Sequence, residues 1–204
     1  MQRLIILVLL ISLTACSQKK EIFDNYTAEI KDFQYNLNKE YADSIRSPLT
    51  KEDLKKFSSL EFFPIDSTYK VTAKFIRTPD EEPFEMTTTT SRKSIEVKYG
   101  EVHFTLKDTT LTLNVYQNVK LKLTDQYKNY LFLPFTDKTN GKESYGGGRY
   151  IGLEIPKGDT IIIDFNKAYN PYCAYNPKYS CPIPPRENDL PVAIKAGVKA
   201  YKNH

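Results

Sequence analysis

The sequence is poor in histidine and cysteine, which are common metal ligands and common residues of nucleophilic catalytic sites. Its 204 residues include two histidines, His103 and His204, and three cysteines. The histidines lie far apart, and no Gly-x-Ser-x-Gly or paired metal-binding His motif is present. His103 falls within an alternating strand pattern, where a packed sheet residue is the simpler interpretation. We therefore expect no metal site and no cofactor.

A dense basic run is also missing. Lys and Arg number 29 against 25 Asp and Glu, and the net charge of +4 is spread along the chain. This pattern does not predict nucleic-acid binding. A hydrophobic content of 40% with 26% charged residues is typical of a globular domain. No internal repeat, low-complexity tract or linker interrupts residues 22–204, so we expect one domain.

The apolar segment at residues 4–13 is about half of the ~20 residues needed to span a bilayer. It follows Arg3 and leads into Leu13-Thr14-Ala15-Cys16, which resembles a bacterial lipobox. We predict a signal peptide at residues 1–15, lipidation of Cys16 and a tether at residues 16–21. An acyl anchor would hold the protein on a lipid membrane of the cell envelope. Ser17, in place of an Asp, favours the outer membrane of a Gram-negative bacterium.

Residues 22–60 read as a helical segment. Apolar residues recur every three or four positions and predict a helix over residues 22–45. Ser47-Pro48 ends it, and Thr50 with Asp53 starts a short second helix through Phe57. We expect the apolar stripe to pack on the domain, and a partner-binding face is the alternative. The stripe consists of Ile22, Tyr26, Ile30, Phe33, Leu37, Tyr41 and Ile45.

Residues 61–204 change to the alternation of strands. Gly100 and residues 107–109 are breaks, and residues 156–159 read as a hairpin turn. About eight short strands predict a mainly β fold, an antiparallel β-sandwich or barrel-like domain with the N-terminal α-helices packed against it. The strands are expected at residues 69–75, 84–90, 95–99, 102–106, 111–116, 130–135, 151–155 and 160–165.

Glycine and proline gather in one stretch, residues 134–191. Five of the eight glycines lie between Gly141 and Gly152, and six of the twelve prolines lie between Pro171 and Pro191. Such residues fix unusual backbone, and the interleaved Tyr, Asn, Asp and Arg offer hydrogen bonds. Residues 166–191 form a loop too long for a mere connection, so we expect it to be functional. Alternating residues 190–194 predict a last extended segment.

Three successive glycines beside an arginine suit an anion. Backbone N–H groups of Gly146, Gly147 and Gly148 can converge, and the Arg149 guanidinium adds a two-pronged donor for a carboxylate, phosphate or sulfate. The alternative is a glycine bulge in which Arg149 pairs structurally with Asp137 or Asp164.

Asp164 and Asp137 are the candidate catalytic residues. Asp164-Phe165-Asn166 closes a strand, where sites are often assembled. Near an apolar wall, Asp164 could act as a general acid or base, with Tyr145, Tyr150 or Tyr169 as partners. An Asx turn that closes the loop is the alternative.

Cys173 and Cys181 are the thiols that remain once Cys16 is lipidated. Two cysteines eight positions apart in a proline-braced loop favour a disulfide in an oxidising envelope. A thiolate metal site lacks further ligands, and a cysteine nucleophile would need His103 as its base.

Several motifs together resemble the bacterial family called domain of unknown function 1684. The resemblance covers roughly residues 54–199 and implies a mostly β domain, often a lipoprotein or secreted protein, with no established activity. Val198 stands where that family is expected to carry Glu. The motifs are Phe62-Phe63-Pro64, Pro134-Phe135-Thr136-Asp137, Thr139-Asn140-Gly141, Tyr145-Gly146-Gly147-Gly148-Arg149-Tyr150, Asp164-Phe165-Asn166, Ala168-Tyr169-Asn170-Pro171, Cys173, Cys181-Pro182, Pro185, Glu187-Asn188, Ala196-Gly197 and Lys199.

Three functions follow as hypotheses. The first is a lipoprotein that binds a small or carbohydrate-like anionic ligand. The second is a hydrolase in which Asp164 or Asp137 activates water and Arg149 stabilises negative charge. The third is a structural or assembly lipoprotein that docks a protein partner through residues 166–185. The ligand-binding residues of the first are Tyr145, Gly146, Gly147, Gly148, Arg149, Tyr150, Asn166, Tyr169 and Asn170.

Overall fold

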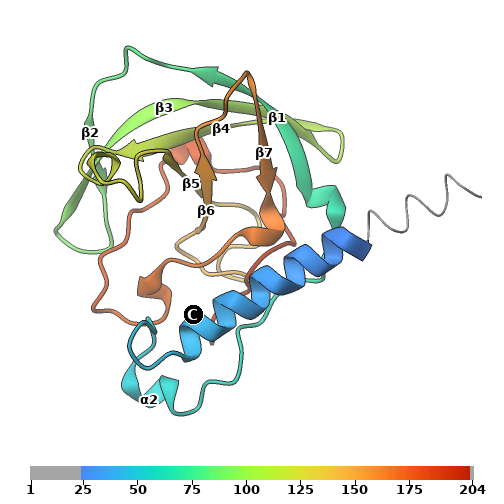
Figure 1. Ribbon diagram of the computed structural model, residues 1–204, viewed down its shortest axis with the longest axis vertical. Helices are drawn as coiled ribbons and strands as arrows, with labels where there is room; N and C mark the ends of the chain where they lie inside the picture. Colours follow the sequence, from blue (N-terminus) through green and yellow to red (C-terminus); the bar gives the residue numbers. More distant parts are fainter. Residues whose placement is uncertain (1–23, 203–204) are drawn as a thin grey trace, which may run out of the picture.

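A seven-stranded antiparallel sheet dominates the computed structural model, which describes residues 24–202. The strand order is β6-β5-β4-β3-β1-β7, and β2 pairs with β3 beside β1. The sheet curls into a half-barrel, with one long helix lying across its open side (Figure 1). The expected mainly β, barrel-like fold is confirmed. The strands are β1 Lys70–Arg77, β2 Phe84–Thr87, β3 Lys93–Leu106, β4 Thr109–Asn118, β5 Tyr130–Phe135, β6 Arg149–Glu154 and β7 Thr160–Asp164.

Gly100 bends a strand instead of ending one. The two strands expected at residues 95–99 and 102–106 form the single strand β3, which carries a register shift between Lys98 and Gly100. A Cβ at Gly100 would lie 2.6 Å from the carbonyl oxygen of Ile76, so only glycine fits this bulge. The seven strands therefore replace the eight expected.

The expected hairpin at residues 156–159 is wrong. These residues do connect β6 to β7, but the two strands occupy opposite ends of the sheet order and share no ladder. The curl of the sheet brings its two ends near enough for a short connection. The segment expected to be extended at residues 190–194 forms no regular strand, but it lies along residues 136–138, where the Leu190 N–H donates to the Thr136 carbonyl at 2.8 Å and the Lys138 N–H to the Val192 carbonyl at 3.0 Å. One parallel bridge, between Thr136 and Asp189, joins this part of the chain to the end of β5.

The N-terminal helix is described over residues 24–42 and ends before the expected residue 45. Asp43 explains the early end, because its carboxylate accepts the N–H groups of Ile45 at 2.8 Å and Arg46 at 3.3 Å. Ile45 is consequently 92% exposed instead of packed. The second helix, α2, begins as expected with Thr50 as its N-cap, and ends at Leu54.

Helix α2 spans Lys51–Leu54, and five 3-10 helices accompany it, η1 Ser67–Tyr69, η2 Leu121–Leu123, η3 Phe165–Lys167, η4 Tyr172–Ala174 and η5 Arg186–Asn188. The predicted signal peptide at residues 1–15 and the predicted tether at residues 16–21, which includes Cys16, lie outside the described residues. Within residues 24–202, no helix is both long and apolar enough to cross a membrane.

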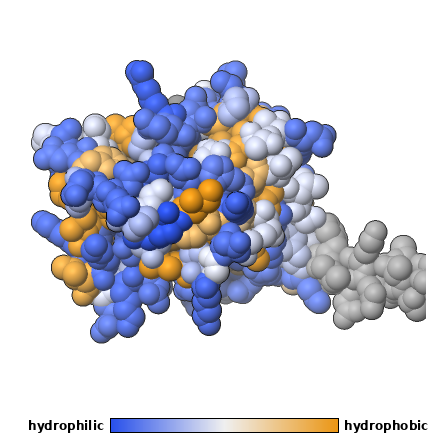
Figure 2. Space-filling model, turned by 90° about the horizontal axis from the view of Figure 1, so that it is seen from above, coloured by the Kyte–Doolittle hydropathy of each residue, from blue (hydrophilic) through white to orange (hydrophobic). Residues whose placement is uncertain are grey.

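The main core fills the half-barrel. Side chains from six of the seven strands meet there, and Leu190, Ile194 and Ala196 cover them from the C-terminal segment. A second cluster joins the N-terminal helix to the long loop through Tyr41, Ala174 and Tyr175. Hydrophilic side chains dominate the face seen in Figure 2, with hydrophobic atoms in separate small patches.

Candidate binding groove

Arg149 lies in the core and does not face a ligand cavity. Its guanidinium forms a 2.8 Å ion pair with Asp137, and both side chains are 0% exposed. The same group donates to the carbonyl oxygens of Ile194, at 2.8 Å, and Ala196. Burial lowers the pKa of Arg149, and Asp137 offsets part of that effect. This geometry corresponds to the structural alternative for Arg149, which fastens the C-terminal segment to β6.

The three glycines form a turn instead of an open nest. The N–H of Gly148 already donates to the carbonyl of Tyr145, at 3.2 Å. Gly148 has a φ of 88°, and a Cβ there would lie 2.7 Å from the carbonyl oxygen of Phe135. Glycine is required here by backbone geometry and packing. Gly146 and Gly147 are exposed beside this turn and do not line the groove described below.

Asp164 is only 6% exposed and takes part in a closed hydrogen-bond network. Its carboxylate accepts the Tyr26 hydroxyl at 3.0 Å and the Asn166 N–H at 3.0 Å, and thereby caps η3. Burial, followed by the nearby Asp164, raises the pKa of Tyr26 well above its usual value. The Asx-turn alternative describes this geometry. Neither Asp164 nor Asp137 lines the groove.

Two other expected residues also have internal partners. Asn170 is buried and donates to the Lys199 carbonyl at 2.8 Å. The hydroxyl of Tyr145 lies 3.8 Å from Cys173 Sγ, and burial raises the pKa of Tyr145 to about 12. Of the nine expected ligand-binding residues, Tyr150 and Tyr169 alone line the main groove of the described structure.

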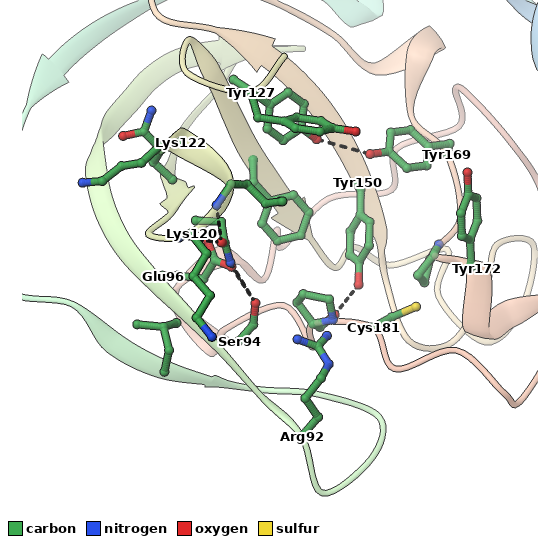
Figure 3. Close-up of a pocket in the computed structure, with 18 of the residues that line it drawn as sticks. Arg92, Ser94, Glu96, Lys120, Lys122, Tyr127, Tyr150, Tyr169, Tyr172 and Cys181 are labelled. Atoms are coloured by element: carbon green, nitrogen blue, oxygen red, sulfur yellow. Dashed lines mark hydrogen bonds between the residues drawn. The ribbon is translucent and has the colours of Figure 1, made fainter. Parts of the chain in front are cut away.

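That groove has a volume of about 880 Å³ and lies between the N-terminal helix, the long loop and one face of the sheet. Eight aromatic side chains contribute to its wall. Tyr150, Tyr169 and Tyr172 stand on the right in Figure 3, Glu96, Lys120 and Lys122 stand on the left, and Arg92 lies below Tyr150. The aromatic and aliphatic lining residues are Phe33, Leu37, Tyr41, Ile95, Leu121, Tyr127, Tyr130, Phe132, Tyr150, Tyr169, Pro171, Tyr172 and Pro182.

Backbone pairing holds the aromatic wall in place. Tyr150 of β6 and Tyr169 of the loop exchange two N–H to carbonyl bonds, of 2.9 and 3.0 Å. The hydroxyls of Tyr130 and Tyr169 lie 3.4 Å apart, and the Tyr150 hydroxyl donates to the Pro182 carbonyl. Burial raises the pKa of Tyr130, Tyr150 and Tyr169, so these hydroxyls stay neutral near pH 7.

The loop at residues 166–191 is also fastened to the far side of the groove. Ile183 N–H donates to the Thr87 carbonyl at 2.8 Å, and Thr89 N–H donates to the Cys181 carbonyl at 2.9 Å. Cys181 lines the groove as a free thiol. Cys173 is likewise free, and its N–H lies 3.2 Å from Cys181 Sγ. The two cysteines are therefore close together without a bond between them.

The charged side of the groove was not found by sequence reasoning. Its cations are Arg92, Lys93, Lys120 and Lys122, and its carboxylates are Glu40 and Glu96. Two segments supply most of them, the start of β3 and the turn after β4. They become neighbours because Glu96 and Asn118 are opposite each other in the β3-β4 ladder. The alternation of Lys120-Leu121-Lys122-Leu123 was a weak signal of a half-exposed segment.

The described residues contain no group of three or more His, Cys, Asp and Glu side chains placed to hold a metal ion. The groove itself combines an aromatic surface, four basic side chains and the buried carboxyl group of Glu96. Aromatic walls with a few convergent polar groups are typical of small-molecule sites.

Comparisons with known proteins identify relatives without a known function. The model of a family described as a protein of unknown function (DUF1684) matches residues 55–199. The chain also resembles the solution NMR structure of an uncharacterised protein from Haloarcula marismortui, with 30% sequence identity and a TM-score of 0.69. The match covers 90% of this chain and 99% of that chain. No match was found among curated proteins.

Proposed function

Because the chain belongs to the DUF1684 family, whose description gives no function, we propose a function from the groove: it binds a small organic anion with an aromatic or apolar body. The observation that carries this proposal is the groove of about 880 Å³ with an aromatic wall on one side and cations on the other. The proposal keeps the expected anionic ligand and moves its site from Arg149 to the groove.

The aromatic wall supports an apolar or planar ligand body. Phe132 and Tyr150 pack edge to face, with ring centroids 4.7 Å apart, and Tyr150 packs likewise against Tyr169 at 6.0 Å. Rings fixed in this way present a rigid surface that loses little conformational entropy when a ligand binds.

The cations support an anionic group on the same ligand. Four basic side chains line the groove against two carboxylates, so the local charge is positive. Arg92 is held by Ser180, which accepts from its Nε at 3.1 Å and, through the backbone carbonyl, from its Nη2 at 2.7 Å. This anchoring fixes the guanidinium at the rim before any ligand arrives.

Calorimetric titration with anilinonaphthalene sulfonate tests the groove, because this probe combines an aromatic body with an anionic group. We expect binding to the wild-type protein and loss of binding in Leu37→Trp, where an indole fills the groove. The matched control is Tyr35→Trp, which places the same side chain on the exposed face of the same helix. Equal binding by both variants would show that the probe sits elsewhere.

A second variant tests the cations. Replacing both Lys120 and Lys122 by Gln removes two rim charges, each worth about 0.2–1 kcal/mol, so affinity should fall about two- to thirtyfold. Lys55→Gln with Lys56→Gln removes the same charge from the end of α2 and should leave affinity unchanged. An equal loss in both double variants would indicate only long-range attraction.

The envelope location is part of the same proposal. The lipobox-like Leu13-Thr14-Ala15-Cys16 supports cleavage before Cys16 and an acyl anchor in a lipid membrane. The mass of the protein extracted from its native membrane would show the acyl chains. Recovery of unmodified full-length chain from the soluble fraction would contradict the anchor.

A Cys173–Cys181 disulfide belongs to this envelope proposal as well. The Cys173 N–H lies 3.2 Å from Cys181 Sγ, so the two residues are neighbours in the folded chain. Such a small ring would stabilise the fold by about 2–3 kcal/mol, mainly by restricting the unfolded chain. The expected result under non-reducing conditions is a mass lower by two hydrogen atoms, whose electrons pass to the oxidants of the envelope, and free thiols after export to the periplasm would contradict it.

A further inference from the structure

Glu96, which lines the groove, has one buried carboxyl oxygen without a hydrogen-bond partner among the described residues. The residue is 2% exposed on β3 and lines the groove beside Ser94 and Asn118. Its Oε1 accepts the Ser94 hydroxyl at 2.7 Å and the Asn118 side-chain amide at 2.7 Å. Its Oε2 is buried and has no hydrogen-bond partner among the described residues.

The surrounding network prevents the carboxyl group from turning to satisfy Oε2. Ser94 lies two positions before Glu96 on the same face of β3, and Asn118 is its cross-strand partner on β4. Asn118 is itself fixed, because its Oδ1 accepts the N–H groups of Lys120 and Leu121, each at 3.0 Å. Both donors therefore hold Oε1, and Oε2 is left without a donor.

A buried carboxyl oxygen without a partner is costly, and native proteins retain few such atoms. A ligand that donates a hydrogen bond to Oε2 would recover this cost. Burial also raises the pKa of Glu96, although Asn118, Ser94 and Arg92 oppose this effect. The group is thus a preset acceptor in a site otherwise lined by rings and cations.

We propose that Oε2 of Glu96 is the specificity-determining acceptor of the groove, and that the ligand carries an O–H or N–H donor next to its anionic group. This inference rests on the proposed function of the groove. Glu96 lies beside Lys120 in Figure 3, which places the donor and the anion at one polar end of the ligand. The ligand class is therefore a hydroxy or amino organic acid with an apolar body.

Three probes with one indole body test the inference by calorimetry. Indole-3-propionate carries the carboxylate alone, indole-3-lactate adds a hydroxyl, and L-tryptophan adds an ammonium group. We expect one or both donor-bearing probes to bind wild-type protein about tenfold or more tightly than the propionate, as a hydrogen bond to a charged group implies. A preference for the lactate or for tryptophan would decide between a hydroxy and an amino acid.

The variant E96Q should remove this preference. Ser94 and Asn118 donate to the oxygen at Oε1, so the glutamine would turn its NH₂ into the groove in place of the acceptor. The control E101Q changes a glutamate of the same strand that does not line the groove, and should keep the preference. Equal affinities of all three probes for wild-type protein, or an unchanged preference in E96Q, would overturn the inference.

A stability measurement shows whether E96Q is folded. Because burial raises the pKa of Glu96 above 4.5, wild-type stability falls as pH rises from 4.5 through the raised pKa. E96Q lacks this loss, so its Tm should equal that of wild type near pH 4 and match or exceed it near pH 7. The other charged groups that line the groove, Arg92, Lys93, Lys120, Lys122 and Glu40, are the same in both proteins.

The two proposals can fail separately. If anilinonaphthalene sulfonate binds and Leu37→Trp abolishes its binding, the groove is a binding site whatever the indole series shows. Indole probes that bind without regard to their donors would then overturn the role of Glu96 alone. If neither the sulfonate nor any indole probe binds the wild-type protein, both proposals are overturned.

Discussion

Arg149 and Asp137 form a buried ion pair at the start of β6, where the C-terminal segment crosses the half-barrel. Asp137 also accepts the N–H groups of Thr139 at 2.8 Å and Ile194 at 3.1 Å. The pair thus joins three parts of the chain that are distant in sequence. Loss of one partner would leave an uncompensated charge in the core, which costs far more than the pair contributes relative to an apolar replacement of both residues.

We expect Arg149→Ala to lower the free energy of unfolding by about 3–5 kcal/mol, because Asp137 would stay buried without its cation. Urea unfolding followed by circular dichroism measures this. Arg186→Ala, at an exposed arginine, is the control and should change stability by about 0.5 kcal/mol or less. A stable Arg149→Ala protein that no longer binds the sulfonate probe would instead indicate that Arg149 binds the ligand.

Residue roles in the long motif could be predicted only as alternatives. Gly146-Gly147-Gly148-Arg149 and Asp164-Phe165-Asn166 each allowed a site and a structural turn, since the same residue types serve both. Which one forms depends on partners elsewhere in the chain, such as Tyr26 for Asp164, which is 138 positions away. Glu96 gave no signal, because its unpartnered oxygen exists only once β3 and β4 are paired.

At the scale of elements, β4 and β5 are joined weakly and a short helix completes the junction. Their ladder contains the single pair Tyr116 and Phe132. Asn188 of η5 bridges the gap: its Oδ1 accepts the Asn114 N–H at 2.8 Å, and its Nδ2 donates to the carbonyls of Asn114 at 2.9 Å and Pro134 at 2.6 Å. The side-chain amide thus replaces missing ladder bonds.

Asn188→Ala should therefore lower the free energy of unfolding by about 2–4 kcal/mol, because it leaves buried backbone groups of β4 and β5 unsatisfied. Thermal or urea unfolding gives the value. Asn36→Ala, at an exposed position of the N-terminal helix, should cost about 0.5 kcal/mol or less. Similar losses in the two variants would mean that η5 does not brace the sheet.

The elements themselves were largely predictable from periodicity. Alternation located most of the strands, a dense apolar run located β5, and the three- and four-residue spacing located the N-terminal helix. The errors lie where the same local sequence allows two structures and contacts with distant residues decide between them. Gly100 bends β3, where Ile76 approaches it closely, instead of ending a strand. Residues 156–159 join two strands that do not pair, instead of forming a hairpin. The sheet order could not be predicted, since no local pattern encodes the curl that brings β6 and β7 together.

In the whole molecule, the N-terminal helix, the sheet and the long loop together form the groove. The helix at residues 24–42 precedes the matched family region of residues 55–199, while the sheet and the long loop lie within it. Tyr26 ties the helix to Asp164, and Tyr41 packs on Tyr175 with ring centroids 4.9 Å apart. Phe33 and Leu37, between these two attachments, face the groove. Sequence analysis identified the helix and the loop, but not the cavity between them.

This arrangement predicts where a ligand stabilises the protein. A ligand in the groove contacts the middle of the helix. At a free ligand concentration of about 100 times Kd, binding would stabilise the folded protein by about 2.7 kcal/mol. Amide hydrogen exchange should therefore slow in residues 33–41 when saturating anilinonaphthalene sulfonate is added, provided the helix opens locally in the free protein. Residues 155–159, which do not line the groove, are the internal control. Protection that appears in the control segment and not in the helix would place the probe outside the groove, and the helix would then be a cover without a part in binding.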